Sequence, residues 1–417
     1  MTCTQPIRKT LITLALVIGG MYLPNAALAQ QCAGKTKANF SLGLDVAGTC
    51  GREKFATAED FFDGLQTDTL HEVRSDYSGS EIATLNIRFN SLPINLEFPN
   101  VGNTGSGALL NFSIPRLGIH QVFQGNDRDD SIDQLEHYVK HSGIINDILK
   151  YQIAHTANNP LTGPGGLLPT TVANDFGLGF DTLPDTVTDG PVGNQFGASL
   201  NFASAKLDGR RSTSATLPFS YTIRNDIDPR RQLVFSLPVT VIETDGAKSY
   251  TGSLGVAYRL PITRAWTLTP AIRYGFSGSA DLATAAALSG GSVSSNYVLR
   301  LNGFDLAIGN MVGYYQTTKF KAGDYSVNPH VRSTVLRNGL MVSQPVTVGG
   351  RAMSLEYSLI DTRYLGTKIY VDNTQEIGVS LGTNRSIASA HSHLRAGMKY
   401  QHGRDVKSLM LNVGYWF

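Results

Sequence analysis

Apolar and polar residues alternate with a period of two in one segment after another between Phe196 and Phe417. Residues two apart in a β-strand point to the same face, so each run predicts a strand with one apolar and one polar face. The clearest run has the apolar members Trp266, Leu268, Pro270, Ile272, Tyr274 and Phe276. Similar runs cover residues 196–202, 215–223, 233–241, 254–260, 297–301, 304–314, 353–359, 377–381, 394–400 and 409–417.

Hairpin signals separate many of these runs. Aspartate or asparagine followed by glycine favours the tight turn that joins two antiparallel strands. Such pairs occur at Asp208-Gly209, Asp245-Gly246, Asn302-Gly303 and Asn338-Gly339. The second half of the chain is therefore expected to be an antiparallel all-β structure, with the pairing between 327 and 373 left open.

A soluble β-sandwich also alternates, but two features favour a membrane barrel. The runs and their flanks allow strands of about 10 to 13 residues, which match a tilted membrane strand better than a globular one. The polar faces consist mainly of Gly, Ser, Thr and Asn, whereas the apolar faces end in Tyr and Trp. At about 16 to 19 residues per strand and loop, residues 196–417 predict a transmembrane antiparallel β-barrel of 12–14 strands, with an even number expected.

The carboxyl terminus carries the sharpest single signal. The chain ends in Phe417, and Tyr415, Val413, Leu411 and Leu409 recede from it on one face. This pattern resembles the terminal strand of Gram-negative outer-membrane β-barrel proteins. The resemblance implies that these five residues form an assembly signal, read by the barrel assembly machinery after delivery by periplasmic chaperones. It also implies the cell outer membrane as the location, with lipid and lipopolysaccharide as neighbours.

The amino terminus has the features of a secretory signal peptide. Arg8 and Lys9 precede an apolar stretch, and Ala27-Leu28-Ala29 provides the small residues that signal peptidase accepts. Residues 1–29 are therefore expected to be removed. Cys32 and Cys50 then remain in an oxidising compartment, which predicts a disulfide between them.

Residues 30–195 differ from the barrel segment in charge and in pattern. They contain 10 basic and 20 acidic side chains, whereas residues 196–417 contain 23 basic and 13 acidic ones. Short alternating runs interrupted by proline are followed by one expected helix from Ser131 to Thr156, capped by residues 129–131. We expect a small mixed α/β region that forms a plug, a periplasmic domain or a surface passenger.

The polar faces of the expected strands carry several cations. If the apolar faces contact lipid, these cations lie in the lumen, where basic side chains attract anions. Alternatively, they pair with the acidic first half of the chain. The candidate lumen-lining and solute-binding residues are Arg224, Arg259, Arg273, Arg300, Arg395 and Lys399.

Other motifs point to chemistry only weakly. Residues 378–382 match the G-x-S-x-G of a hydrolase elbow around Ser380, but they lie inside an alternating strand. The pairs Asp127/Asp129, His137/His141 and His391/His393 have spacings that allow metal binding, although loop, cap and solvated-surface roles are favoured. We expect no enzyme activity, metal or cofactor. With a net charge of +2 and no basic run, nucleic acid is not expected as a partner.

The leading hypothesis is a channel or uptake pore for small anionic or polar solutes, closed by an acidic plug. The alternative is a translocator that secretes or displays residues 30–195, because this order of regions is similar to autotransporters. Residues 266–270 (WTLTP) resemble a strand phrase of their translocator domains. In that interpretation the helix 131–156 threads the pore. An outer-membrane hydrolase is the second alternative.

Overall fold

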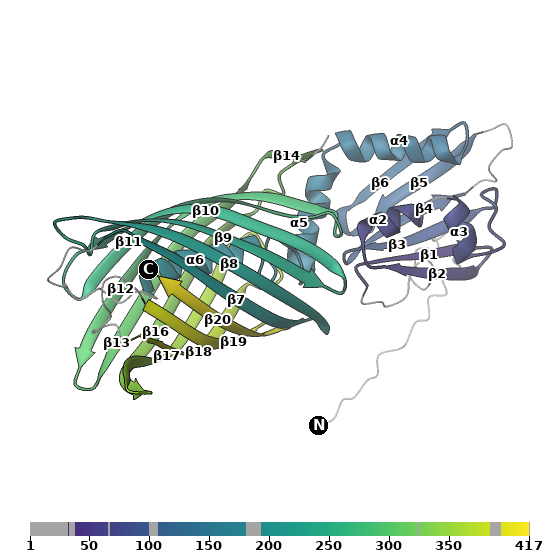
Figure 1. Cartoon of the computed structure of the whole chain (residues 1–417). Helices are drawn as coiled ribbons and strands as arrows, with labels where there is room; N and C mark the ends of the chain where they lie inside the picture. The colour runs from purple at the N-terminus through teal and green to yellow at the C-terminus, as the bar shows by residue number, and fades with distance from the viewer. Residues whose placement is uncertain are drawn as a thin grey trace, which may run out of the picture.

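The computed structural model describes residues 32, 38–65, 67–99, 107–180, 193–322, 325–383 and 393–416. Residues 40–155 form a region of one sheet and four helices, and residues 195–416 form a closed barrel (Figure 1). The expected signal peptide (1–29) and Phe417 lie outside the described residues.

The N-terminal region, here called the sheet domain, is built on a six-stranded antiparallel sheet in the order β2-β1-β3-β4-β5-β6. Its core includes Phe40, Leu42 and Leu44 of β1, which are all fully buried. The predicted disulfide between Cys32 and Cys50 is present. The strands are β1 (Phe40–Val46), β2 (Thr49–Phe55), β3 (Ala83–Phe89), β4 (Leu92–Phe98), β5 (Ala108–Ile114) and β6 (Ile119–Gly125).

The single helix expected from Ser131 to Thr156 is wrong, because the structure divides it at Gly143. Gly143 has φ of 78°, a left-handed conformation that ends a helix readily because glycine has no side chain. The cap is also Asp127 rather than residues 129–131: its side chain accepts a hydrogen bond from Asp130 N. The helices of this domain are α2 (Ala58–Asp63), α3 (Thr67–Val73), α4 (Arg128–His141) and α5 (Ile144–His155), with a short turn η1 (Pro115–Leu117).

The barrel has twelve strands, within the predicted range, and each pairs antiparallel with its neighbours until β20 closes on β7. The small hairpin β14 (Phe320–Ala322) and β15 (Tyr325–Val327) lies in one connection. The barrel strands are β7 (Gln195–Leu207), β8 (Arg210–Arg224), β9 (Gln232–Thr244), β10 (Ala247–Pro261), β11 (Trp266–Ser279), β12 (Thr284–Leu301), β13 (Phe304–Thr318), β16 (Arg332–Val348), β17 (Arg351–Gly366), β18 (Asn373–Thr383), β19 (His393–Gly403) and β20 (Val406–Trp416).

The apolar faces of these strands point outward. Leu409, Leu411, Val413 and Tyr415 of β20 are each about half exposed, whereas Ser408 of the same strand is buried. An apolar exterior around a polar interior is the arrangement of a barrel whose solvent is lipid. The chain therefore has the fold of an outer-membrane β-barrel, as the terminal strand predicted.

One expected turn is wrong. Asn338 and Gly339 lie in the middle of β16, paired with Asn310 and Gly309 of β13, instead of joining two strands. Gly339 is needed there for space: a Cβ atom would lie 2.9 Å from the ring of Phe176. The other three predicted turns do connect adjacent barrel strands.

The two rims of the barrel have different neighbours. The proximal rim carries the start of β7, the end of β20 and the turns at 302–303 and 349–350; the distal rim carries the turns at 208–209, 245–246, 280–283 and 404–405. The sheet domain rests on the distal rim (Figure 1). Ala58 N donates to Asp281 O at 2.7 Å, and Asn90 Nδ2 donates to Leu282 O at 3.0 Å.

A further helix, α6 (Leu167–Phe180), lies inside the barrel (Figure 1). It contacts the strands from β9 to β13 and β16. Among the described residues, no helix has both the length and the apolar character needed to cross a membrane.

Candidate functional site in the barrel lumen

Helix α6 is held against one wall of the lumen by apolar packing. Leu168, Val172, Phe176 and Phe180 recur every four residues, which places them on one face of the helix. All four are buried. They belong to a cluster that also contains Ala307, Met311, Val335 and Met341 of the barrel wall.

Two glycines of the wall make room for the helix. A Cβ atom at Gly309 would lie 2.3 Å from the ring of Phe180, and one at Gly339 would contact both Phe176 and Phe180. The rings of Phe176 and Phe180 themselves pack with centroids 4.7 Å apart. This close approach explains why small residues face the lumen at this level of β13 and β16.

Asp175 provides the polar anchor of the helix. Its Oδ1 atom accepts from Arg273 Nε at 2.8 Å and lies 2.7 Å from Arg273 Nη2. Its Oδ2 atom accepts from the hydroxyl groups of Tyr315 at 2.8 Å and Ser292 at 3.4 Å. The side chains of Asp175 and Arg273 are 0% and 2% exposed, so this is a fully desolvated ion pair.

The Arg273 guanidinium also bonds to the wall. Its Nη1 donates to Ser253 Oγ at 3.2 Å and its Nη2 to Ser236 Oγ at 2.8 Å. Asp175 and Arg273 thereby connect α6 to strands β9, β10, β11, β12 and β13 through side chains alone. Removing one member of such a pair leaves the other charge buried and typically costs about 3–5 kcal/mol.

A second buried ion pair lies at the edge of the helix. Arg337 Nη1 lies 2.9 Å from Glu376 Oε1, and both side chains are about 5% exposed. The Arg337 guanidinium also lies over the ring of Phe176, 5.2 Å from its centroid. This pair joins β16 to β18 and lies between α6 and the cavity described next.

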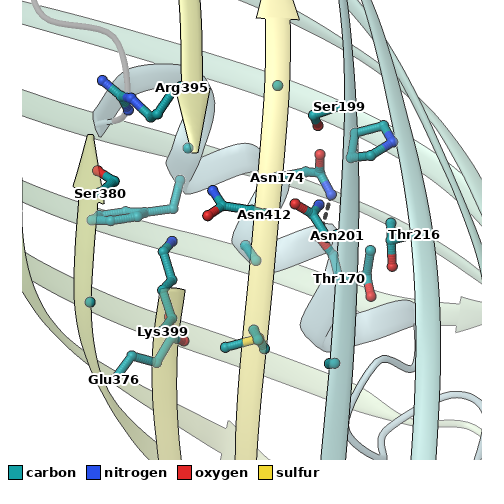
Figure 2. A pocket seen from close by; sticks show the side chains of 18 of the residues that line it. Thr170, Asn174, Ser199, Asn201, Thr216, Glu376, Ser380, Arg395, Lys399 and Asn412 are labelled. Carbon is teal, nitrogen blue, oxygen red and sulfur yellow. Dashed lines mark hydrogen bonds between the residues drawn. The ribbon is translucent and has the colours of Figure 1, made fainter. Parts of the chain in front are cut away.

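The opposite wall faces a cavity. Beside α6 the lumen keeps a cavity of about 340 Å³, bordered mainly by β7, β8 and β17 to β20, with a few residues of β9, β10 and β16. Figure 2 shows Asn201, Asn412, Arg395 and Lys399 from this wall around the space next to Thr170 and Asn174 of the helix. The lining mixes polar and apolar side chains and carries both signs of charge, with Glu356 and Glu376 as the acids.

The predicted lumen cations do not form one group. Arg273 holds the helix, and Arg259 Nε donates to the backbone oxygen of Leu178 at 2.6 Å. Arg395 Nη2 lies 3.0 Å from Glu356 Oε1, whereas Lys399 lines the cavity with no side-chain partner among the described residues.

Arg224 and Arg300 lie elsewhere, close to the proximal rim. Arg224 donates to Gln195 Oε1 at 3.1 Å, and Arg300 is exposed and paired in register with Asp305. The six cations therefore take several different roles in the structure.

The weaker motifs acquire structural positions. Ser380 lies inside β18, and its Oγ donates to Glu356 Oε2 at 2.8 Å, so the strand-turn-helix of a hydrolase elbow is not formed around it. His137 and His141 stack on α4 with ring centroids 4.1 Å apart. His391 lies outside the described residues. Within the described ranges no group of three or more His, Cys, Asp or Glu residues could hold a metal ion.

Sequence reasoning missed Asp175, Arg337, Glu376 and Tyr315. The signal for Asp175 was present: it is the one charged residue in the apolar segment from Leu167 to Phe180. Arg337 was missed because residues 338–339 were interpreted as a turn. The prediction that the helix 131–156 threads the pore was also wrong. That segment forms α4 and α5, which lie outside the barrel, whereas the helix in the lumen is α6.

Comparisons with known proteins identify only distant structural likenesses. No family model and no curated protein matches the sequence. The β domain of the Bordetella autotransporter BrkA is similar over 54% of this chain and 98% of its own, with 14% identity and a TM-score of 0.42. The translocator domain of NalP from Neisseria meningitidis (60% and 95% covered, 12% identity, TM-score 0.42) and the KdgM porin (52% and 98% covered, 11% identity, TM-score 0.32) are also similar.

Proposed function

We propose that this protein displays its sheet domain at the cell surface, with the barrel as its outer-membrane anchor and α6 as the connection through the pore. One observation carries the proposal. The chain leaves the sheet domain, enters the lumen at the distal rim, and continues as α6 toward the proximal rim, where β7 begins. Near the start of this path, Gly165 lies beside Ser214 and Ile242 at the distal end. Farther along, Gly179 O accepts from Asn296 Nδ2.

Orientation in the membrane follows from the barrel itself. An even number of strands places the start of β7 and the end of β20 at the same rim. The terminal strand carries the expected assembly signal, which is read from the periplasm, so we assign the proximal rim to the periplasmic side. Outer-membrane barrels have short periplasmic turns and longer outer loops. The longest connection between barrel strands, residues 319–331, lies at the distal rim, whereas the other connections do not differ in this way between the two rims. In the orientation given by the terminal strand, the sheet domain lies outside the cell.

The contacts at the distal rim favour a domain that stays attached. Arg210 Nη1 of β8 donates to Asn39 Oδ1 at 2.6 Å, and Tyr370 N donates to Ile153 O at 3.0 Å. The backbone of Asn328 also bonds to Asn146 Oδ1 at 2.8 Å. A domain tied to several rim loops suits permanent display better than release.

Cysteine labelling of intact cells tests the proposal. Asp133 is exposed on α4, and Arg264 is exposed in the turn between β10 and β11 at the proximal rim. We expect a membrane-impermeant maleimide to label Asp133→Cys in intact cells and Arg264→Cys only after permeabilisation of the outer membrane. The reverse pattern would place the sheet domain in the periplasm and would refute surface display.

The cavity beside α6 favours a second function in the same lumen, the passage of small polar or anionic solutes. Its lining includes Arg259, Arg395 and Lys399 against the acids Glu356 and Glu376. Single-channel recording on the purified protein, with and without residues 30–195, tests this function. Absence of conductance in both forms, or clear cation selectivity, would rule out an anion pore.

A further inference from the structure

Three cations form a continuous row on the outside of the barrel. Lys206 of β7 is paired in register with Lys407 of β20 on one side and with Arg211 of β8 on the other. Residues directly opposite in antiparallel strands share a face, and all three are exposed. On the next strand, His402 of β19 continues the row opposite Lys407. We call Lys206, Arg211 and Lys407 the seam triad.

Like charges placed directly opposite one another destabilise a sheet unless an anion compensates them. None of the three forms an ion pair or a side-chain hydrogen bond with any residue that the structure describes, even though Asp208 and Asp405 occupy the adjoining turns. The same level of β9 and β10 is arranged differently, because Glu243 there faces Lys248. The triad is therefore a local excess of positive charge without a protein partner.

The position of the triad matches the edge of the lipid. Lys206 lies ten residues from Phe196 on β7, and Arg211 lies ten residues from Tyr221 on β8. At about 3.3 Å per residue and a tilt of about 40°, ten residues rise roughly 25 Å, which is the height of the apolar band of such barrels. Phe202 and Leu409, both about half exposed, lie on the lipid side of the triad.

We propose that the seam triad binds the phosphate groups of a lipid A molecule in the outer leaflet, with the acyl chains against the apolar face of β20, β7 and β8. The choice of leaflet rests on the proposed orientation, because the triad lies at the distal rim. Ammonium and guanidinium groups bind phosphate through charge-assisted hydrogen bonds. Three cations on adjacent strands fit a headgroup that carries two phosphates.

Native mass spectrometry of the full-length protein in detergent tests the site with three probes: bisphosphorylated lipid A, lipid A lacking both phosphates, and inorganic phosphate. We expect wild type to bind the first probe and the Lys206→Gln/Arg211→Gln/Lys407→Gln variant to bind it about 100-fold more weakly, at about fivefold per cation near a membrane surface. The matched control Lys248→Gln removes a cation at the same level of the barrel, outside the seam triad, and is expected to bind lipid A as wild type does.

Equal binding of lipid A by the triple variant, or equal binding of the dephosphorylated lipid by wild type, would overturn the site. Full competition by inorganic phosphate at equal concentration would also overturn it, because the ligand would then be free phosphate. Heat-modifiable gel migration checks that the triple variant is folded, and Lys206→Gln against Lys206→Arg repeats the test with a smaller change. Labelling of Asp133→Cys is independent of this assay, so surface display and lipid binding can fail separately.

Discussion

Strands β9 to β13 with β16, and strands β17 to β20 with β7 and β8, line the same lumen, but the two groups have different neighbours. The first group, here called the helix wall, packs against α6 through apolar side chains, glycines and the pair Asp175–Arg273. The second group, the open wall, presents polar and charged side chains to a cavity. The difference shows that one barrel combines an anchor for a helix with a cavity beside that helix.

The two walls also use ion pairs differently. Asp175–Arg273 joins the helix to the helix wall and is fully buried. Arg395–Glu356 joins two strands of the open wall, and its arginine is 14% exposed beside the cavity. Water can solvate a charge that loses its partner at an accessible site but not at a buried one, so breaking the first pair is expected to cost more than breaking the second.

The largest expected effect is the loss of one buried charge in the helix wall. Arg273→Gln leaves the Asp175 carboxylate desolvated, which should weaken the docking of α6 by about 3–5 kcal/mol. The measurement is the rate of proteolysis between residues 181 and 193, with heat-modifiable migration as the check on the barrel. Arg395→Gln in the open wall is the matched control, expected to have a clearly smaller effect. Equal proteolysis of both variants would remove the contrast between the walls.

Asp175→Leu in the Arg273→Met background sharpens the same contrast. Replacing a buried ion pair by apolar residues of similar size is often neutral or stabilising, whereas breaking it is not. We therefore expect the double variant to protect residues 181–193 better than either single variant does. If the double variant is as sensitive as the sum of the singles, the two charges do not act as a pair.

A somewhat smaller effect is expected from filling the space that the helix occupies. Gly309→Leu would place side-chain atoms where the ring of Phe180 lies, and overpacking of this kind costs about 1–3 kcal/mol. Gly252→Ala is a control, because its Cβ atom would meet nothing closer than 3.9 Å. We expect faster proteolysis after α6 for the first variant only. An unchanged rate would mean that the helix does not rest against β13.

In the open wall, a charge change should alter transport more than stability. Lys399→Glu reverses the sign of a cavity-lining charge, and lumen substitutions tune the selectivity of barrels. If the cavity conducts, the ratio of anion to cation permeability should fall in planar-bilayer recordings. Lys248→Glu, on the outer face, should leave that ratio unchanged. A ratio that responds to neither change would argue against a pathway along this wall.

The smallest effect is expected for Ser380→Ala. The variant loses one hydrogen bond to Glu356, but that carboxylate keeps its bond to Arg395, so we expect the barrel to stay assembled. It also tests the hydrolase alternative, because esterase activity that disappears with Ser380 would contradict a purely structural role. Melting of the barrel, followed by gel migration at increasing temperature, and ester hydrolysis are the two measurements.

Some elements followed from the sequence because their physical cause is local. The turns at Asp208-Gly209 and Asp245-Gly246 were predicted because glycine readily adopts the positive φ that such turns need. In the structure these glycines have φ of 76° and 86°. The outward face of β20 was predicted because alternation repeats along one strand. Asn338-Gly339 has the same local signal but forms no turn. Glycine is needed at position 339 because a side chain there would collide with the ring of Phe176, which is far away in the sequence.

The sequence by itself determined that residues 196–417 alternate, that the apolar face ends in aromatic residues, and therefore that the chain closes into a lipid-facing barrel. The tertiary structure decided what fills that barrel. The segment from Leu167 to Phe180 reads as an ordinary apolar helix, and the partners of Asp175 lie about 100 residues or more along the chain, at Arg273, Ser292 and Tyr315. An alternating pattern fixes which face of a strand points inward, but contacts between side chains distant in sequence arise only when the barrel closes around the helix.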